Sequence, residues 1–152
     1  MKNEEIRNEI IRVLNTPAEE LCITHPTVFD HKANFVEYTK DGYFTLKYPI
    51  QPLQCNGFGT LQGGTIAAFI DDNFGLFSFV ALEGKTVSTI NMIVNYHKAA
   101  FLTDGYLTVT SHVVSAGKRV ISMASQAYNP NGDLIASCST NCANVQNGYL
   151  EY

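Results

Sequence analysis

The clearest pattern in the sequence is a long apolar stretch in the middle of the chain. Between Gly64 and about Leu82 almost every position is apolar or small, and polar residues mark no continuous face. A helix that is apolar all round is typical of one covered on all sides. Asp71 and Asp72 lie at the middle of the stretch, where carboxylates are costly in a bilayer. We therefore predict a long helix buried in protein.

After this helix the pattern changes to period two, which is typical of strands. Alternating apolar positions run through four segments, and Gly-containing turns at 115–118 and 129–133 separate the last three. Consecutive strands joined by short turns pair antiparallel, and we expect a meander of three or four strands. The residues that mark the segments are Ile90, Met92, Val94 and Tyr96, then Leu107, Val109 and Val113, then Val120, Ala124 and Tyr128, then Ile135, Ala143 and Val145.

A hairpin is predicted before the long helix. Two aromatic-rich segments, residues 29–38 and 43–50, flank Lys40-Asp41-Gly42. Asp-Gly between extended segments is a hairpin signal, because glycine tolerates the positive φ of the turn. A helix, a hairpin, a long buried helix and then further strands indicate an α+β protein. We expect one antiparallel sheet wrapped around the central helix.

The first 25 residues predict a helical extension. Apolar residues recur at helical spacing over residues 2–14, with charges between them. Thr16-Pro17-Ala18-Glu19 has the form of a capping box with proline at the first helical position, and His25-Pro26 ends this second helix. The length of 152 residues suits one compact domain, so we predict a single domain over 1–152 with 1–25 as its N-terminal extension.

Composition narrows the function classes. The net charge of −4 argues against a nucleic-acid binder held by phosphate contacts. The four cysteines form no CxxC pair, and no apolar signal segment follows the N-terminus, so we expect reduced thiols in a cytoplasmic protein without a membrane span. The four histidines show no pair at metal-ligand spacing, and we expect no metal site.

Two features could carry chemistry. A carboxylate inside an apolar helix is costly unless it is hydrogen-bonded or ion-paired. Asp71-Asp72 therefore indicates a cleft or an interface. The alternative is that both carboxylates are solvated at a helix surface or paired with lysine or arginine. Adjacent helix residues point ~100° apart, so the two face different neighbours. The Gly63-Gly64 pair at the helix start leaves backbone N–H groups open to a developing negative charge, or else is a turn made for close packing.

The sequence around these features resembles the PaaI-like hotdog acyl-CoA thioesterases. The resemblance rests on the segment Asn56 to Asp71, in which Gly59-Thr60-Leu61-Gln62-Gly63-Gly64 leads into the apolar helix and reaches an acidic residue. It continues through residues 87–92, through 96–100 and through Ala116-Gly117-Lys118-Arg119-Val120. In all it spans about residues 30 to 145 and implies a hotdog fold.

The resemblance also implies roles for particular residues. Asp71 matches the acidic residue that acts as general base or nucleophile, and the N–H of Gly64 matches the donor to the thioester oxygen. Asn56 and Thr89 match residues that arrange the site. The site implies a homodimer, with dimers often pairing into tetramers, and requires no cofactor besides the coenzyme A of the substrate. Expected substrate contacts are Gly63, Phe58, Phe74, Lys118 and Arg119, with Lys98 as a further candidate and solvated surface charge as the alternative for the basic residues.

The sequence departs from the family pattern at one position. Gln62 stands where the family has histidine, and an amide can hydrogen-bond but cannot titrate near neutral pH. The expected function is hydrolysis of an acyl-CoA thioester by Asp71 with Gly64 as oxyanion donor. The alternative is a non-catalytic protein that binds acyl-CoA or a similar ligand. A hotdog dehydratase ranks last, because the histidine and acidic pairing of those enzymes is not found.

Overall fold

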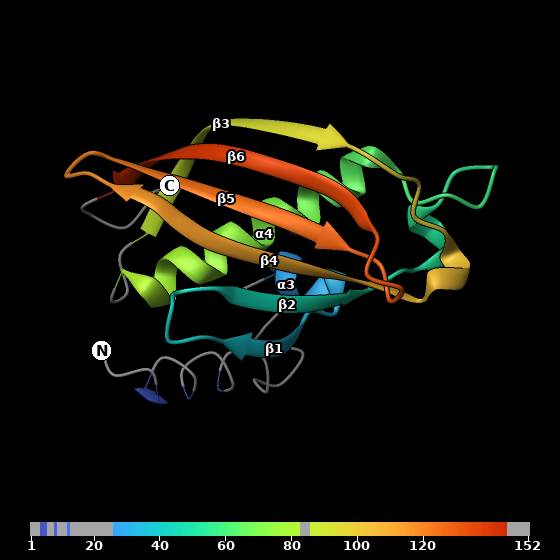
Figure 1. Cartoon of the computed structure of the whole chain (residues 1–152), viewed down its shortest axis with the longest axis horizontal. Helices are drawn as coiled ribbons and strands as arrows, with labels where there is room; N and C mark the ends of the chain where they lie inside the picture. Colours follow the sequence, from blue (N-terminus) through green and yellow to red (C-terminus); the bar gives the residue numbers. More distant parts are fainter. Residues whose placement is uncertain (1–3, 6–7, 9–11, 13–25, 83–85, 146–152) are drawn as a thin grey trace.

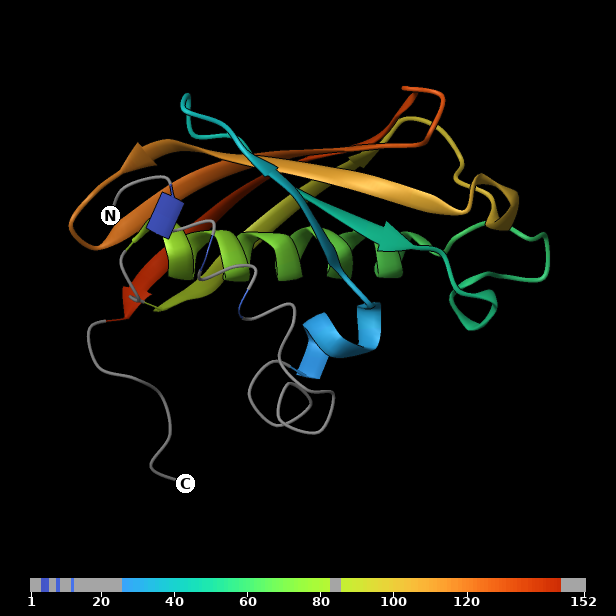
Figure 2. The same ribbon diagram turned by 90° about the horizontal axis from the view of Figure 1, so that it is seen from below.

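The fold is a six-stranded antiparallel sheet curled along one side of a long helix (Figures 1 and 2). This computed structural model describes residues 4–5, 8, 12, 26–82 and 86–145. The strand order is β1-β2-β4-β5-β6-β3. The elements are α3 (Pro26–His31), β1 (Asn34–Tyr38), β2 (Phe44–Pro49), the 3-10 helix η1 (Pro52–Gln54), α4 (Gly63–Ala81), β3 (Thr86–Tyr96), the 3-10 helix η2 (Leu102–Asp104), β4 (Tyr106–Ala116), β5 (Val120–Tyr128) and β6 (Leu134–Val145).

The hydrophobic core lies between α4 and the concave face of the sheet. Alternate residues of the strands point to this face, as the fully buried Leu107 and Val109 of β4 show. Aromatic rings fill the layer, with Tyr48 stacked on Phe69 at a centroid distance of 4.7 Å. The ring of Phe44 in β2 stacks in a similar way on the ring of Phe77 in α4. The predicted wrapping of an antiparallel sheet around a central helix is therefore confirmed.

The order of the strands differs from the predicted meander. β4, β5 and β6 pair in sequence order as expected, but β3 pairs with β6 and β4 pairs with β2. The chain between β3 and β4, residues 97–105, therefore crosses from one side of the sheet to the other. Alternation along a strand identifies its buried face and not its neighbour, so the sequence pattern could not show this crossing. Its consequence is that β3 becomes an edge strand.

Helix α3 corrects one predicted segment. The predicted hairpin is present, with Gly42 at φ 84° in the turn between β1 and β2. However, residues 29–31, which were expected to be extended, belong to α3. Pro26 begins this helix, whereas we expected it to end one, and proline fits the first turn because its missing N–H is unpaired there anyway. Lys32, at φ 52°, ends the helix in the left-handed region.

Helix α4 has the predicted length but is not covered on all sides within one chain. Gly64, Asp71 and Gly75 are exposed, and Ala67 and Ala68 between them are half-buried. These positions recur every three or four residues and form one stripe along the helix, which we call the α4 stripe. A Cβ at Gly75 would meet no atom within 4 Å, so none of the described residues requires glycine there.

Edge strand β3 continues this exposed surface. A register shift between Thr89 and Asn91 leaves Ile90 out of the ladder with β6. Ile90 is therefore 55% exposed and not on the face of Met92, as the alternation had suggested. Ile93, which points outward, is 61% exposed. The α4 stripe and β3 together present apolar groups and an unpaired strand edge.

The predicted N-terminal helices lie mostly outside the described residues. Residues 4, 5, 8 and 12 are helical, and the predicted second helix from Thr16 to His25 falls entirely on residues that are not described. The division into a 1–152 domain with a 1–25 extension therefore stays a prediction. Within the described parts of the chain, no helix is both long and apolar enough to cross a membrane.

Candidate active site

The start of α4 presents two backbone donors that no described part of the chain uses. The Gln62 carbonyl accepts the N–H groups of Thr65 at 3.0 Å and Ile66 at 3.1 Å. The N–H groups of Gly63 and Gly64 have no hydrogen-bond partner among the described residues. A Cβ built at Gly64 would meet no described atom within 4 Å, so there is open space beside this residue. The helix dipole favours negative charge at this point.

Asn56 shapes the loop that leads to this helix start. Its Oδ1 accepts hydrogen bonds from the Phe58 N–H at 3.0 Å, the Thr60 N–H at 3.2 Å and the Thr60 hydroxyl at 2.9 Å. The Asn56 N–H also donates to the Thr60 carbonyl. One side chain thus closes the five-residue turn, which fixes the approach to α4. Phe58, at the tip of this turn, is 91% exposed.

Asp71 is the polar residue at the centre of the α4 stripe, and Thr89 of β3 lies beside it. The Thr89 hydroxyl donates to Asp71 Oδ1 at 2.8 Å, and both residues are exposed. This bond joins α4 to the edge strand β3 and holds the carboxylate in one orientation. The second carboxylate oxygen has no partner among the described residues, so it is available to a water molecule or substrate.

Asp72, and not Asp71, is the buried carboxylate of the pair. The Thr27 hydroxyl donates to Asp72 Oδ1 at 2.5 Å, and His31 Nδ1 lies 3.6 Å from Oδ2. Both partners belong to α3, so the carboxylate joins α3 to α4. Burial raises the pKa of Asp72, and the Thr27 and His31 contacts oppose that rise. The Tyr48 hydroxyl lies buried nearby, and burial and Asp72 raise its pKa well above 10.0.

The raised pKa of Asp72 predicts how stability depends on pH. An acid whose pKa is higher in the folded state binds more protons when folded, so its contribution to stability falls as pH rises above its ordinary pKa of 3.8. Asp72→Asn removes this titration and keeps an oxygen that accepts from Thr27. We expect the variant to gain stability relative to the wild type as pH rises above 3.8.

Urea unfolding at several pH values in this range measures the difference in unfolding free energy between Asp72→Asn and the wild type. The matched control is Asp30→Asn, which changes an exposed carboxylate on α3. The control separates the effect of the buried carboxylate from the effect of a change of one unit in net charge. A constant difference for Asp72→Asn would contradict the assignment of a raised pKa to this group.

A cavity of about 370 Å³ opens beside the start of α4. Its wall includes Gly63 and Tyr96, and the Tyr96 hydroxyl donates to the Gly63 carbonyl at 2.6 Å. Tyr96 was not among the predicted site residues. The signal that could have pointed to it is the glycine at 63, because a glycine often marks a close approach by another group. The remaining wall residues are Thr60, Leu61, Ile66, His97, Lys98, Ala99 and Ala100.

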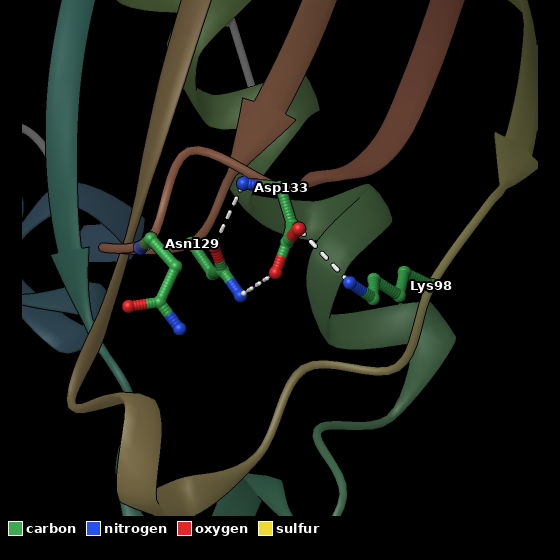
Figure 3. A network of polar contacts seen from close by, with 4 residues as sticks. Lys98, Asn129 and Asp133 are labelled. Atoms are coloured by element: carbon green, nitrogen blue, oxygen red, sulfur yellow. Dashed lines mark hydrogen bonds and ion pairs between the residues drawn. The ribbon is translucent and has the colours of Figure 1, made fainter.

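Lys98, one of the wall residues, also forms an ion pair. Its Nζ lies 2.9 Å from Asp133 Oδ1, in the turn between β5 and β6 (Figure 3). Asn129 supports the same carboxylate through its Nδ2 at 3.1 Å and accepts the Asp133 N–H at 2.9 Å. The hydrogen bond from Lys98 holds the pKa of Asp133 below its usual value. The Lys98 ammonium is still largely exposed, so it holds the turn and also faces solvent.

The other predicted site residues are spread over the molecule. Lys118 and Arg119 are exposed in the turn between β4 and β5, at the end of the sheet where α4 finishes (Figure 1). The 19-residue α4 is about 28 Å long, so this turn lies far from Gly64 within one chain. Phe74 is 1% exposed in the core, and its predicted substrate contact stays a prediction. Among the described residues, no group of three metal-ligating side chains is close enough to hold an ion.

The chain belongs to the thioesterase superfamily. Residues 58–136, slightly more than half of the chain, match the sequence model of that family. The match begins at the tip of the Asn56 turn and includes α4, Asp71, Thr89 and Tyr96. None of the curated proteins compared with the chain matches it in sequence. The resemblance to thioesterases inferred from the Asn56–Asp71 segment is confirmed.

Solved structures of thioesterases share the fold. A thioesterase from Haemophilus influenzae has a TM-score of 0.75 at 17% identity, with 88% of this chain and 91% of that chain covered. A "phenylacetic acid degradation-related protein" from Ralstonia eutropha JMP134 has a TM-score of 0.73 at 18% identity, with 86% and 98% covered. A "hypothetical thioesterase protein" from Streptococcus pneumoniae TIGR4, crystallised with coenzyme A, has a TM-score of 0.67 at 20% identity, with 74% and 85% covered. At these identities the likeness shows the hotdog fold.

Proposed function

We propose that this protein hydrolyses an acyl-CoA thioester to a free acid and coenzyme A. The observation that carries the proposal is the α4 stripe, on which an unpaired Gly64 N–H and the Asp71–Thr89 pair lie on one exposed face. A backbone donor at a helix start stabilises the oxyanion of acyl transfer, and a carboxylate supplies a base or a nucleophile. The streptococcal structure with coenzyme A supports the substrate class.

The chemistry has two forms that use the same residues. As general base, Asp71 takes a proton from water, the resulting hydroxide adds to the thioester carbon, and the C–S bond breaks to release the CoA thiolate. As nucleophile, Asp71 adds to that carbon, the C–S bond breaks to release the CoA thiolate, and water then hydrolyses the resulting mixed anhydride. In both forms the negative charge that develops on the carbonyl oxygen is stabilised by the Gly64 N–H. Thr89 keeps the carboxylate aimed in one direction.

The spacing of the two groups supports a site that is shared between two copies of the chain. Gly64 and Asp71 are seven residues apart on one helix, which is about 10.5 Å along its axis. Reacting groups need to lie within about 3.5 Å of the atoms they act on, so one thioester does not reach both groups of the same helix. A two-fold axis that pairs β3 with β3 brings Asp71 of one copy toward Gly64 of the other. The exposed Ile90 and Ile93 support this interface.

The same symmetry gives Lys118 and Arg119 a place at the site. A two-fold axis perpendicular to β3 exchanges the two ends of the sheet. The turn with Lys118 and Arg119 of one copy then lies near the α4 start of the other copy. Two cations at that position suit the phosphates of coenzyme A. Further pairing of such dimers into a tetramer stays a prediction.

A thiol-release assay tests the proposal. The wild type is offered acyl-CoAs from acetyl to palmitoyl, together with aromatic esters, and free CoA is followed with a thiol reagent. We expect turnover of at least one acyl class well above the rate in buffer. No turnover of any ester, with a thermal shift on adding acyl-CoA, would favour the second candidate. That candidate is a ligand-binding hotdog protein, and Gln62 in place of histidine is the observation in its favour.

Gln62→His should keep or increase turnover. The Gln62 main chain caps α4 whatever the side chain is, and the side chain itself is exposed. Histidine restores a ring donor beside the helix start, where a developing oxyanion lies. We expect kcat between unchanged and about tenfold higher, with Gln62→Ala as the control that removes the amide. A large loss in Gln62→His would mean that the site is built around the amide.

A further inference from the structure

Tyr96 lies unusually close to the start of α4. It is the last residue of β3, and its hydroxyl donates to the Gly63 carbonyl at 2.6 Å. Its ring covers the Cα of Gly63, because a Cβ built there would lie 3.0 Å from the ring carbon that bears the hydroxyl. A side chain at position 63 would press on this ring, whereas a Cβ at Gly64 would meet no described atom within 4 Å. The contact joins the edge strand to the first turn of the helix.

The hydrogen bond reaches the peptide group that carries the proposed oxyanion donor. The carbonyl of Gly63 and the N–H of Gly64 belong to one planar peptide, in which the C–N bond has partial double-bond character. A donor on the oxygen draws electron density toward it, and hydrogen bonds in such a chain strengthen one another. The N–H at the other end becomes a better donor as a result. The bond also fixes the tilt of the peptide plane.

We propose that Tyr96 is the positioning residue for the oxyanion donor. Its hydroxyl orients and polarises the Gly63–Gly64 peptide, so that the Gly64 N–H meets the thioester oxygen as its charge develops. This inference rests on the proposed hydrolysis and adds a residue outside the Asp71–Thr89 pair. Tyr96 acts through the peptide and does not itself donate to the thioester oxygen.

The phenol suits this role because it stays protonated. Burial raises the pKa of Tyr96 above its usual 10.0, and Cys138 raises it further. The hydroxyl is therefore neutral and able to donate over the whole range in which such an enzyme is assayed. The Gly63 carbonyl can accept this bond together with the regular helix bond, since a carbonyl oxygen has two lone pairs. No other side chain among the described residues bonds to this peptide.

Tyr96→Phe tests the inference by removing one oxygen and keeping the ring over Gly63. Charge on the thioester oxygen develops only in the transition state, so kcat should fall and KM should not change. We expect kcat about three- to tenfold lower, with the melting temperature within error of the wild type. The matched control is Tyr43→Phe. Tyr43 lies directly before β2 in the hairpin turn, and its hydroxyl has no partner among the described residues. This substitution should leave kcat unchanged.

A second measurement on the ligand-free protein reports on the peptide itself. The amide 15N resonance of Gly64 depends on hydrogen bonding at the carbonyl of Gly63, because both atoms share one peptide. We expect this resonance to move upfield in Tyr96→Phe and to stay in place in Tyr43→Phe. A role that only holds the helix start in place would lower the melting temperature and would not lower kcat at constant KM.

The outcomes separate this inference from the proposed function. If the wild type turns over acyl-CoA and Tyr96→Phe has wild-type kcat, or if the Gly64 resonance does not move, the role of Tyr96 is overturned and thioester hydrolysis stands. If the wild type turns over no acyl-CoA, the proposed hydrolysis fails and the role of Tyr96 toward an oxyanion fails with it. A lower kcat at constant KM together with a moved Gly64 resonance supports both.

Discussion

Asp71→Asn should lower kcat for acyl-CoA hydrolysis about a thousandfold. The amide can still accept the hydrogen bond of Thr89, so the link between α4 and β3 is kept, but it can neither take a proton from water nor attack the thioester carbon. Because Asp71 is exposed and outside the core, the melting temperature should change little. Thiol-release assays at saturating substrate measure kcat. Isothermal titration calorimetry with coenzyme A measures binding, and we expect the affinity to be unaffected.

The matched control for this variant is the neighbouring Asp72→Asn. It makes the same chemical change one residue along the helix, at a carboxylate that contacts Thr27 and His31 and not the α4 stripe. We expect it to keep wild-type kcat. Equal rates for Asp71→Asn and the wild type would remove Asp71 from the mechanism and would leave the start of α4 as a binding site only.

Mixed oligomers of two inactive variants should recover activity. Gly64→Pro removes the proposed donor, and proline is tolerated in the first turn of a helix, where this N–H has no partner among the described residues. We expect it to lose about a hundredfold or more in kcat, whereas Gly64→Ala keeps the N–H and serves as control. In a dimer of one Asp71→Asn chain and one Gly64→Pro chain, both defects fall in one of the two shared sites. The other site has an intact Asp71 and an intact Gly64.

Carrying a different affinity tag on each variant allows the mixed species to be isolated. If sites are shared, it should have about half of the wild-type activity, because one site of two is intact. If each site lies within one chain, both chains of the mixed species are defective and the activity stays at the level of the variants alone. That second result would contradict the two-fold arrangement and would require another group within about 3.5 Å of the substrate at each helix start.

Much of the fold could be predicted from local pattern. The apolar run from Gly64 onward, the Asp41-Gly42 turn and the period-two segments after residue 86 each correspond to an element that the structure contains. The pairing of β3 with β6 could not be predicted, because alternation is the same for every partner strand. The position of Ile90 depends on a bulge, and a bulge changes the alternation without any change in residue type.

The candidate site could be predicted only in part, because a sequence shows local motifs and does not show tertiary contacts. The glycine pair and the acidic residue that follows it in the helix form a motif within one segment, so sequence alone points to both. Which of Asp71 and Asp72 is buried depends on α3, which packs on α4 and supplies Thr27 and His31. The contact of Tyr96 with Gly63 joins positions 33 apart in the sequence. Contacts of this kind depend on tertiary packing, and one sequence does not reveal them.

The two edges of the sheet are unequal, and this difference decides what kind of assembly the sheet allows. β3 has 11 residues and exposed apolar groups, whereas β1 has five residues, a register shift between Phe35 and Glu37, and a charge at Glu37. Head-to-tail growth needs an edge of one copy to accept the other edge of the next, and a short, irregular, charged strand is a poor acceptor. A β3 edge that pairs with its own kind closes after two copies. In the proposed β3-to-β3 dimer the edge is used up by the partner, so the assembly ends at a closed pair and does not grow into a fibre.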